Sequence, residues 1–151
     1  MDDLIIRDGK ITDVNTIVRF QKNMARETEN RELSDDCINQ GVMAVFSEDE
    51  KGFYLVAESN GEVVGSLLVT YEWSDWRNGW FWWIQSVYVA KEWRRKGVYR
   101  YLNDEVSQRC RKTGGVCGLR LYVEKNNTTA QNVYKNLGMK ETDYLLYERE
   151  L

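Results

Sequence analysis

The stretch from Trp80 to Val106 constrains the fold more than any other part of this 151-residue chain. Residues 81–89 are rich in aromatic and β-branched side chains and carry no charge, which predicts a strand buried on both faces. The apolar spacing then changes to every fourth position, which predicts a helix with the apolar residues Val98, Leu102, Val106 and Cys110. A basic loop that contains a glycine joins the two elements.

This loop has the chemistry of an anion site. The first N–H groups of a helix have no intrahelical partner and point along the axis at whatever lies before it. Gly97 allows the backbone to approach a ligand closely because it has no Cβ. The helix dipole and the three cations Arg94, Arg95 and Lys96 favour a phosphate.

The segment from Val89 to Tyr99 resembles the acyl-CoA signature of the GNAT superfamily of N-acyltransferases. That signature is Gln or Arg, two residues, Gly, one residue, and then Gly or Ala. Arg94 and Gly97 occupy the first two fixed positions. Tyr99 does not fit the third, and its bulk narrows the approach of a phosphate to the backbone there. The position between an apolar strand and a helix is the context that the motif requires.

A second GNAT-like pattern follows a later strand and matches at five positions, which are Asn127, Ala130, Tyr134, Gly138 and Met139. The resemblance implies that Asn127 contacts the cofactor arm or the neighbouring strand, and that Tyr134 is the general acid beside the thioester sulfur. The chemistry is compatible, because a thiol has a pKa of about 8.5 and a tyrosine of pKa about 10 can protonate the thiolate. The alternative is that Tyr134 is a core aromatic on an amphipathic helix.

Composition indicates an ordinary soluble globular protein, with 42% hydrophobic and 30% charged residues, and we expect one domain over residues 1–151. A net charge of −3 argues against nucleic acid as a partner. The sequence has no apolar run long enough for a membrane span and no signal-peptide pattern. Its three unclustered cysteines suit a reducing compartment, so we expect a cytoplasmic protein.

The chain has no histidine. This excludes a histidine base, a histidine-ligated metal and every Ser-His or Cys-His nucleophile. Catalysis would have to use carboxylates, tyrosine, backbone N–H groups and water, and we expect no metal.

The remaining patterns predict a strand at 4–7, helices from Thr12–Asp13 and from Ser34, and then strands at 53–57 and 63–71 around Asn60-Gly61. A charged connection is predicted at 26–32. A strand at 119–123, a helix from Asn127 to Leu137 ended by Gly138, and a last strand at 145–151 complete the order. The predicted class is α+β, a mixed, mostly antiparallel twisted sheet with helices on both faces, which matches the element order of the GNAT fold.

The resemblance implies an N-acetyltransferase that moves an acetyl group from acetyl-CoA to a primary amine of a small molecule, directly in a ternary complex. The N–H of Val87 could stabilise the oxyanion. The implied cofactor-binding residues are Val87, Tyr88, Val89, Arg94, Arg95, Lys96, Gly97, Val98, Tyr99, Arg100, Asn127 and Tyr134.

The base is the least determined group. Several GNAT proteins have a glutamate on the central strand where this chain has Gln85, and an amide can only orient a water. Glu29 and Glu27 in the charged connection are candidates for the acceptor side, and Glu29 is the preferred base. A solvated loop carboxylate is the alternative reading of Glu29.

Trp76 and Trp80 could form a cation–π wall for the amine, or could fill a core or a homodimer interface. Two other functions stay open. One is acetylation of a lysine or an N-terminus in a protein or peptide, and the other is a non-catalytic module that binds acyl-CoA.

Overall fold

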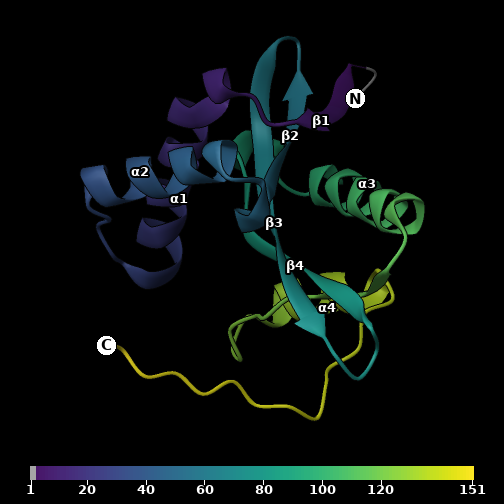
Figure 1. Ribbon diagram of the computed structural model, residues 1–151. Coiled ribbons are helices and arrows are strands. Elements are labelled where there is room, and N and C mark those ends of the chain that lie inside the picture. The colour runs from purple at the N-terminus through teal and green to yellow at the C-terminus, as the bar shows by residue number, and fades with distance from the viewer. Residues whose placement is uncertain (1–2) are drawn as a thin grey trace. The chain divides into compact units, whose positions relative to one another are not determined.

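The computed structural model describes residues 3–151, which form two compact units divided after Leu121. The first unit contains a five-stranded sheet in the order β1-β2-β3-β4-β5 among the described residues (Figure 1). Neighbouring strands are antiparallel except β4 and β5, which are parallel. The strands are β1 (Leu4–Asp8), β2 (Phe53–Ser59), β3 (Glu62–Ser74), β4 (Gly79–Val89) and β5 (Val116–Arg120).

Helices cover both faces of this sheet. On one face lie α1 (Val14–Glu29) and α2 (Asp35–Ser47), and on the other lies α3 (Val98–Thr113) (Figure 1). Between these two helices and the first face packs one apolar cluster, which includes Val14, Ile17, Val42 and Val56. The second is sealed by another, which includes Leu55, Leu67, Val98, Leu102 and Val106.

The predicted α+β class, with a mixed sheet and helices on both faces, is confirmed. The local signals behave as their chemistry requires. Ser34 caps α2 by accepting a hydrogen bond from the N–H of Cys37. Asn60 and Gly61 both have positive φ in the turn between β2 and β3, as a two-residue hairpin demands.

The second unit, Tyr122–Leu151, contains α4 (Thr128–Asn136). The Asn127 side chain caps this helix by accepting a hydrogen bond from the N–H of Ala130 at 3.1 Å. At the other end Gly138 has a φ of 85°, and the N–H of Met139 reaches back to the carbonyl of Tyr134 at 3.0 Å. The predicted glycine stop is therefore confirmed.

Two predicted boundaries and one predicted strand were wrong. Residues 26–29 belong to α1 rather than to a connection, because Arg and Glu are good helix formers and the helix ends only where Asn30 turns left-handed. The strand predicted at 119–123 is β5, which ends at Arg120. Residues 145–151 form no strand, because apolar residues make a strand only where another strand pairs with them, and none does so among the described residues.

Within residues 3–151, none of the helices combines the length and the hydropathy that a membrane span requires.

Candidate functional site

Strand β4, which lies between β3 and β5, is paired along less than half of its length on the β5 side. β5 pairs with residues 80–83, and within the described chain residues 84–89 have a strand partner only in β3. Parallel strands that separate in this way leave backbone N–H and C=O groups available to an extended ligand.

A β-bulge lies in this half of β4. Ser86 and Val87 together oppose the single residue Leu67 of β3, since Gln85 pairs with Leu68 and Tyr88 with Ser66. Ser86 has a φ of 52°, a left-handed conformation that a serine rarely adopts. The buried side chain of Gln21 on α1 donates to the Ser86 carbonyl at 3.5 Å, so α1 contacts the bulge directly.

The loop between β4 and α3 contains two left-handed residues, Arg95 with φ 63° and Gly97 with φ 80°. A Cβ on Gly97 would meet only a ring carbon of Tyr101, 3.9 Å away. The glycine is therefore needed for its backbone conformation and not for space in the loop. The N–H of Tyr101 bonds to the Gly97 carbonyl at 3.2 Å, which closes the first turn of α3. The N–H groups of such a first turn point along the axis toward the loop before the helix.

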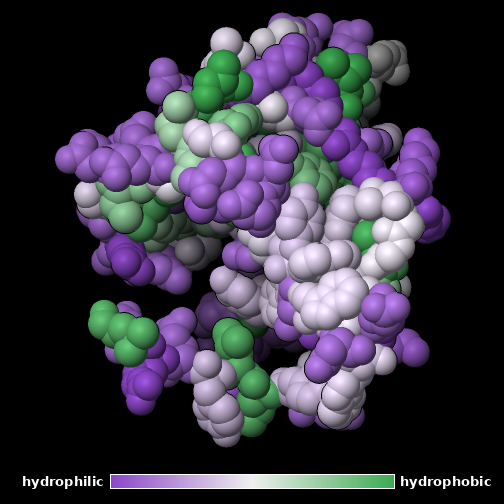
Figure 2. Space-filling model, viewed as in Figure 1, coloured by the Kyte–Doolittle hydropathy of each residue, from purple (hydrophilic) through white to green (hydrophobic). Residues whose placement is uncertain are grey.

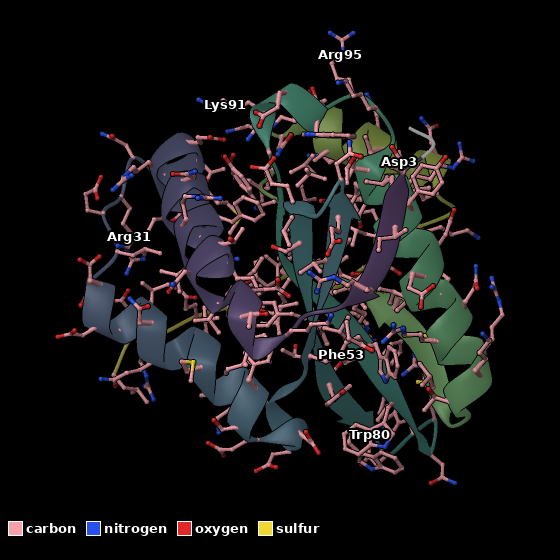
Figure 3. All side chains as sticks on the ribbon, turned by 90° about the horizontal axis from the view of Figure 1, so that it is seen from above. Asp3, Arg31, Phe53, Trp80, Lys91 and Arg95 are labelled. Carbon is pink, nitrogen blue, oxygen red and sulfur yellow. The ribbon has the colours of Figure 1, made fainter. Side chains whose placement is uncertain are left out.

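Cations surround this helix start. Arg95 is exposed, and the Lys96 Nζ lies 5.0 Å from the centroid of the Trp93 ring. Arg94 instead turns back, donating from Nε to the Val89 carbonyl at 2.8 Å and from Nη2 to Glu27 Oε2 at 2.7 Å. Lys91 and Arg95 lie at the same end of the sheet in Figure 3, and Trp80 lies at the opposite end.

The candidate base residues occupy different positions. Gln85 faces the α1 side of the sheet and donates from Nε2 to Thr70 Oγ1. Glu29 is the last residue of α1 and is exposed. Glu27 hydrogen bonds to Tyr88 and Arg94, and burial would raise the pKa of its carboxyl, but these hydrogen bonds outweigh burial and lower it.

The tryptophans predicted for the substrate lie away from Gln85. The Trp80 ring contacts the Trp73 ring, with 5.0 Å between their centroids. Side chains alternate between the two faces of a strand, and Trp80 is five residues before Gln85, so Trp80 lies on the α3 face and Gln85 on the opposite face. Trp76 is 89% exposed in the turn between β3 and β4. Trp73, Trp76 and Trp80 form what we call the tryptophan patch, and in Figure 2 near-neutral, pale side chains gather over this β3–β4 hairpin.

The two predicted residues of the second unit are both on or beside α4. Tyr134 is half-buried, and burial raises the pKa of its hydroxyl above the ordinary value, so it carries its proton at neutral pH. The side chain of Asn127 is used as the cap of α4, with its Oδ1 accepting the N–H of Ala130.

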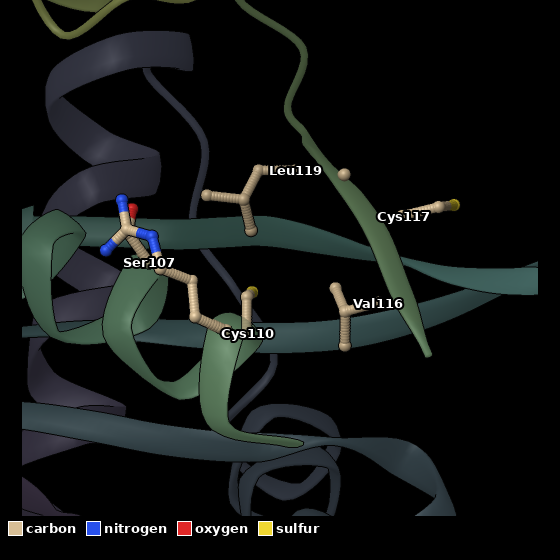
Figure 4. Close-up of a pocket in the computed structure, with 7 residues that line it drawn as sticks. Ser107, Cys110, Val116, Cys117 and Leu119 are labelled. Carbon is tan, nitrogen blue, oxygen red and sulfur yellow. The ribbon is translucent and has the colours of Figure 1, made fainter. Parts of the chain in front are cut away.

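A separate depression of about 250 Å³ lies between α3 and β5 (Figure 4). It is lined by Ser107, Cys110, Arg111, Val116, Cys117, Gly118 and Leu119. Cys110 is thirteen residues after Gly97, or roughly 20 Å along a helix. The depression is therefore at the other end of α3 from the predicted phosphate site.

Two features of the site have no signal in the sequence. The left-handed Ser86 carries none, because serine does not mark a positive φ. Gln21 looks like any polar residue on an amphipathic helix, and only the packing of α1 on β4 reveals its bond to the bulge.

Comparison with known proteins gives a consistent result. Residues 14–139 match the model of the acetyltransferase (GNAT) family. A possible acetyltransferase from Clostridium difficile 630 is 46% identical, with a TM-score of 0.92 over 99% of this chain and 98% of that one.

Two more distant solved structures share the fold. A predicted acetyltransferase from Clostridium acetobutylicum, solved with acetyl-CoA, is 18% identical with a TM-score of 0.78, over 97% of this chain and 96% of the other. AAC(6')-Iy, solved with the bisubstrate analogue CoA-S-monomethyl-acetylneamine, is also 18% identical, with a TM-score of 0.77 and 98% of each chain covered.

Proposed function

Because the chain belongs to the GNAT family of acetyltransferases, we propose that it transfers an acetyl group from acetyl-CoA to a primary amine of a small molecule. The observation that carries this proposal is the half-unpaired strand β4, which leads through a basic loop into the first turn of α3. An extended arm and a pyrophosphate are the two parts of CoA that such an arrangement suits.

The pyrophosphate would rest on the backbone N–H groups of residues 95–100. The left-handed Arg95 and Gly97 turn the chain so that the loop leads directly into α3. The exposed cation of Arg95 and the ammonium of Lys96 supply the positive charge. None of this requires a metal ion.

The pantetheine arm would pair with residues 86–89 like an added strand. The bulge at Ser86 and Val87 interrupts the regular alternation of N–H directions at this point. We place the N–H of Val87 at the thioester oxygen, where it would stabilise the negative charge that develops as the amine attacks.

The transfer itself would occur in a ternary complex. The amine nitrogen forms a bond to the acetyl carbon, and the bond from that carbon to sulfur breaks. The departing thiolate takes a proton from the Tyr134 hydroxyl, and the amine gives up its own proton to water or a carboxylate. Glu29 is our choice for that carboxylate, with Gln85 as the residue that orients a water.

The test is turnover of acetyl-CoA against a panel of amines, measured by the release of free thiol and by mass analysis of the product. The panel should include a diamine, an aminoglycoside and a lysine peptide. Amine-dependent thiol release with an acetylated small molecule supports the proposal. Binding of acetyl-CoA without turnover would assign a binding module instead, and turnover confined to the peptide would assign a protein acetyltransferase.

We also propose that the protein is a homodimer that associates through the tryptophan patch. Trp73 and Trp80 remain 49% and 43% exposed, and large exposed aromatics are typical of interfaces. Light scattering should give a dimer mass for the wild type and a monomer mass for Trp76→Ser with Trp73→Ser. A wild-type monomer at micromolar concentration would refute the association.

A further inference from the structure

The arginine of the phosphate-loop motif does not extend toward the start of α3. Its guanidinium is used by two acceptors that lie behind the loop, the Val89 carbonyl at 2.8 Å and Glu27 Oε2 at 2.7 Å. Its Cζ also lies 5.2 Å from the centroid of the Tyr88 ring. The side chain of Arg94 therefore fastens the loop to the end of β4 and to α1.

Glu27 is the point where these contacts meet. Its Oε1 accepts a hydrogen bond from the Tyr88 hydroxyl at 3.0 Å and lies 3.8 Å from Lys91 Nζ, while Oε2 is held by Arg94. The Glu27 side chain is 28% exposed, and its carboxyl stays charged, because burial would raise its pKa but the hydrogen bonds from Arg94 and Tyr88 outweigh burial and lower it. The Tyr88 hydroxyl, the Arg94 guanidinium and the Lys91 ammonium thus already surround this carboxylate with donors from the cofactor side.

The position of Glu27 in the chain gives these contacts a wider effect. Tyr88 belongs to the part of β4 that follows the bulge, and it is buried against Phe20 of α1 with ring centroids 4.9 Å apart. Glu27 is two residues from the end of α1, where the connection to α2 begins. One carboxylate thus joins the bulged strand, the basic loop and the last turn of α1.

We propose that Glu27 is a positioning residue, which holds Arg94 and the loop between β4 and α3 in the conformation that receives the CoA pyrophosphate. This inference rests on the proposed function for the identity of the ligand. It assigns Glu27 to the cofactor side of the site, not to the acceptor amine, and it leaves the phosphate charge to Arg95 and Lys96.

The direction in which one substitution changes CoA affinity distinguishes this role from a simple electrostatic effect. CoA is a polyanion, so removing a nearby negative charge without any change of shape should strengthen its binding. If Glu27 holds the loop, Glu27→Gln should instead weaken CoA binding by about tenfold, the effect of losing a charge-assisted hydrogen bond. Calorimetry measures the Kd, and Glu32→Gln is the matched control, because Glu32 pairs with Arg26 at an exposed position.

A double-mutant cycle tests the partner. Arg94→Gln should weaken CoA binding about as much as Glu27→Gln, and the double variant should be no weaker than either single one. Tighter binding by Glu27→Gln, or additive losses in the double variant, would overturn the proposal.

A measurement made without ligand tests the positioning role of Glu27 independently of the test of the proposed function. Hydrogen exchange at the amides of residues 90–100 should become faster in Glu27→Gln and in Arg94→Gln, and should not change in Glu32→Gln. If the wild type binds no CoA, the proposed ligand is wrong, and the exchange rates still decide whether Glu27 holds the loop. Unchanged exchange in Glu27→Gln would refute the positioning role.

Discussion

Arg7 and Asp13 are joined by two parallel hydrogen bonds, from Nη1 to Oδ2 at 2.7 Å and from Nη2 to Oδ1 at 3.1 Å. The pair connects β1 to the residue that precedes α1, and Asp13 Oδ2 also accepts the N–H of Lys10 at 2.7 Å. Burial would raise the pKa of the Asp13 carboxyl, but the hydrogen bonds from Arg7 and Lys10 outweigh it and hold the pKa below its ordinary value.

This pair predicts a pH-dependent stability. Asp13→Asn should cost about 2 kcal/mol of unfolding free energy near neutral pH, because it leaves the Arg7 charge with Glu58 alone. Since the pKa of Asp13 is depressed in the folded state, its contribution is present above the unfolded value of about 3.9 and is lost as the pH falls below it. Urea unfolding should show the gap between wild type and variant narrowing as the pH is lowered through the folded-state pKa of Asp13, which lies below the unfolded value.

The exposed Asp104 on α3 provides the control for that experiment. Asp104→Asn should stay close to the wild type at each pH, as expected for a solvated carboxylate. A gap for Asp13→Asn that kept its size in acid would mean that the lost stability is steric and not electrostatic.

Gly97→Asp should abolish acetyl-CoA binding while the protein stays folded. The substitution places a Cβ and a negative charge where we propose that the pyrophosphate rests, and the loop has room for a Cβ there. Gly97→Asn is the matched control, because asparagine has the same shape, carries no charge and tolerates a positive φ. Calorimetry should find much weaker binding for the aspartate than for the asparagine, and equal affinities would contradict the phosphate assignment.

Tyr134→Phe should lower kcat by about 10²-fold with little change in acetyl-CoA affinity, because it keeps the ring and removes only the proton donor. Burial raises the pKa of this hydroxyl, so the wild type should show no loss of activity from its ionisation below about pH 10. The control is Tyr144→Phe, an exposed tyrosine of the same unit. A kcat within about twofold of the wild type would make Tyr134 a structural residue.

Glu29→Gln should lower kcat/KM for the amine most at low pH, with a smaller loss as the pH approaches the amine pKa of about 10.4. The reason is that a base is needed only while the amine is protonated. Deprotonating the amine near pH 7 costs about 4–5 kcal/mol. Glu32→Gln is again the control, since Glu32 is an exposed carboxylate in the connection that follows Glu29 and α1. A pH profile identical to that of the wild type would leave water oriented by Gln85, or deprotonation before binding, as the route.

The elements that the sequence predicted correctly depend on short-range chemistry. Ser34 caps a helix, Asn60-Gly61 tolerates the left-handed turn, and Gly138 ends α4, each through contacts within a few residues. The uncharged run before the basic loop likewise predicted the strand that is β4. These signals were sufficient for the α+β class.

The parts that could not be predicted depend on partners far along the chain. The predicted α1 was too short, because charged residues suit a helix end and a loop equally well. Glu27 and Glu29, which were predicted in a connection, lie in the helix. The link from Glu27 to Arg94 spans 67 residues, and no local pattern specifies it. The bulge at Ser86 depends on the register against β3, which periodicity does not determine.

The open half of β4 has a further consequence for the behaviour of the empty protein. Unpaired strand backbone is a template for other chains, so the apo form should be the more prone to associate and precipitate. A ligand that completes this edge would act as a folding partner, adding about 3 kcal/mol of stability at about a hundred times its Kd. The melting temperature and the solubility of the protein should therefore both rise with acetyl-CoA concentration, so the cofactor would serve as a missing piece of the sheet as well as the acetyl donor.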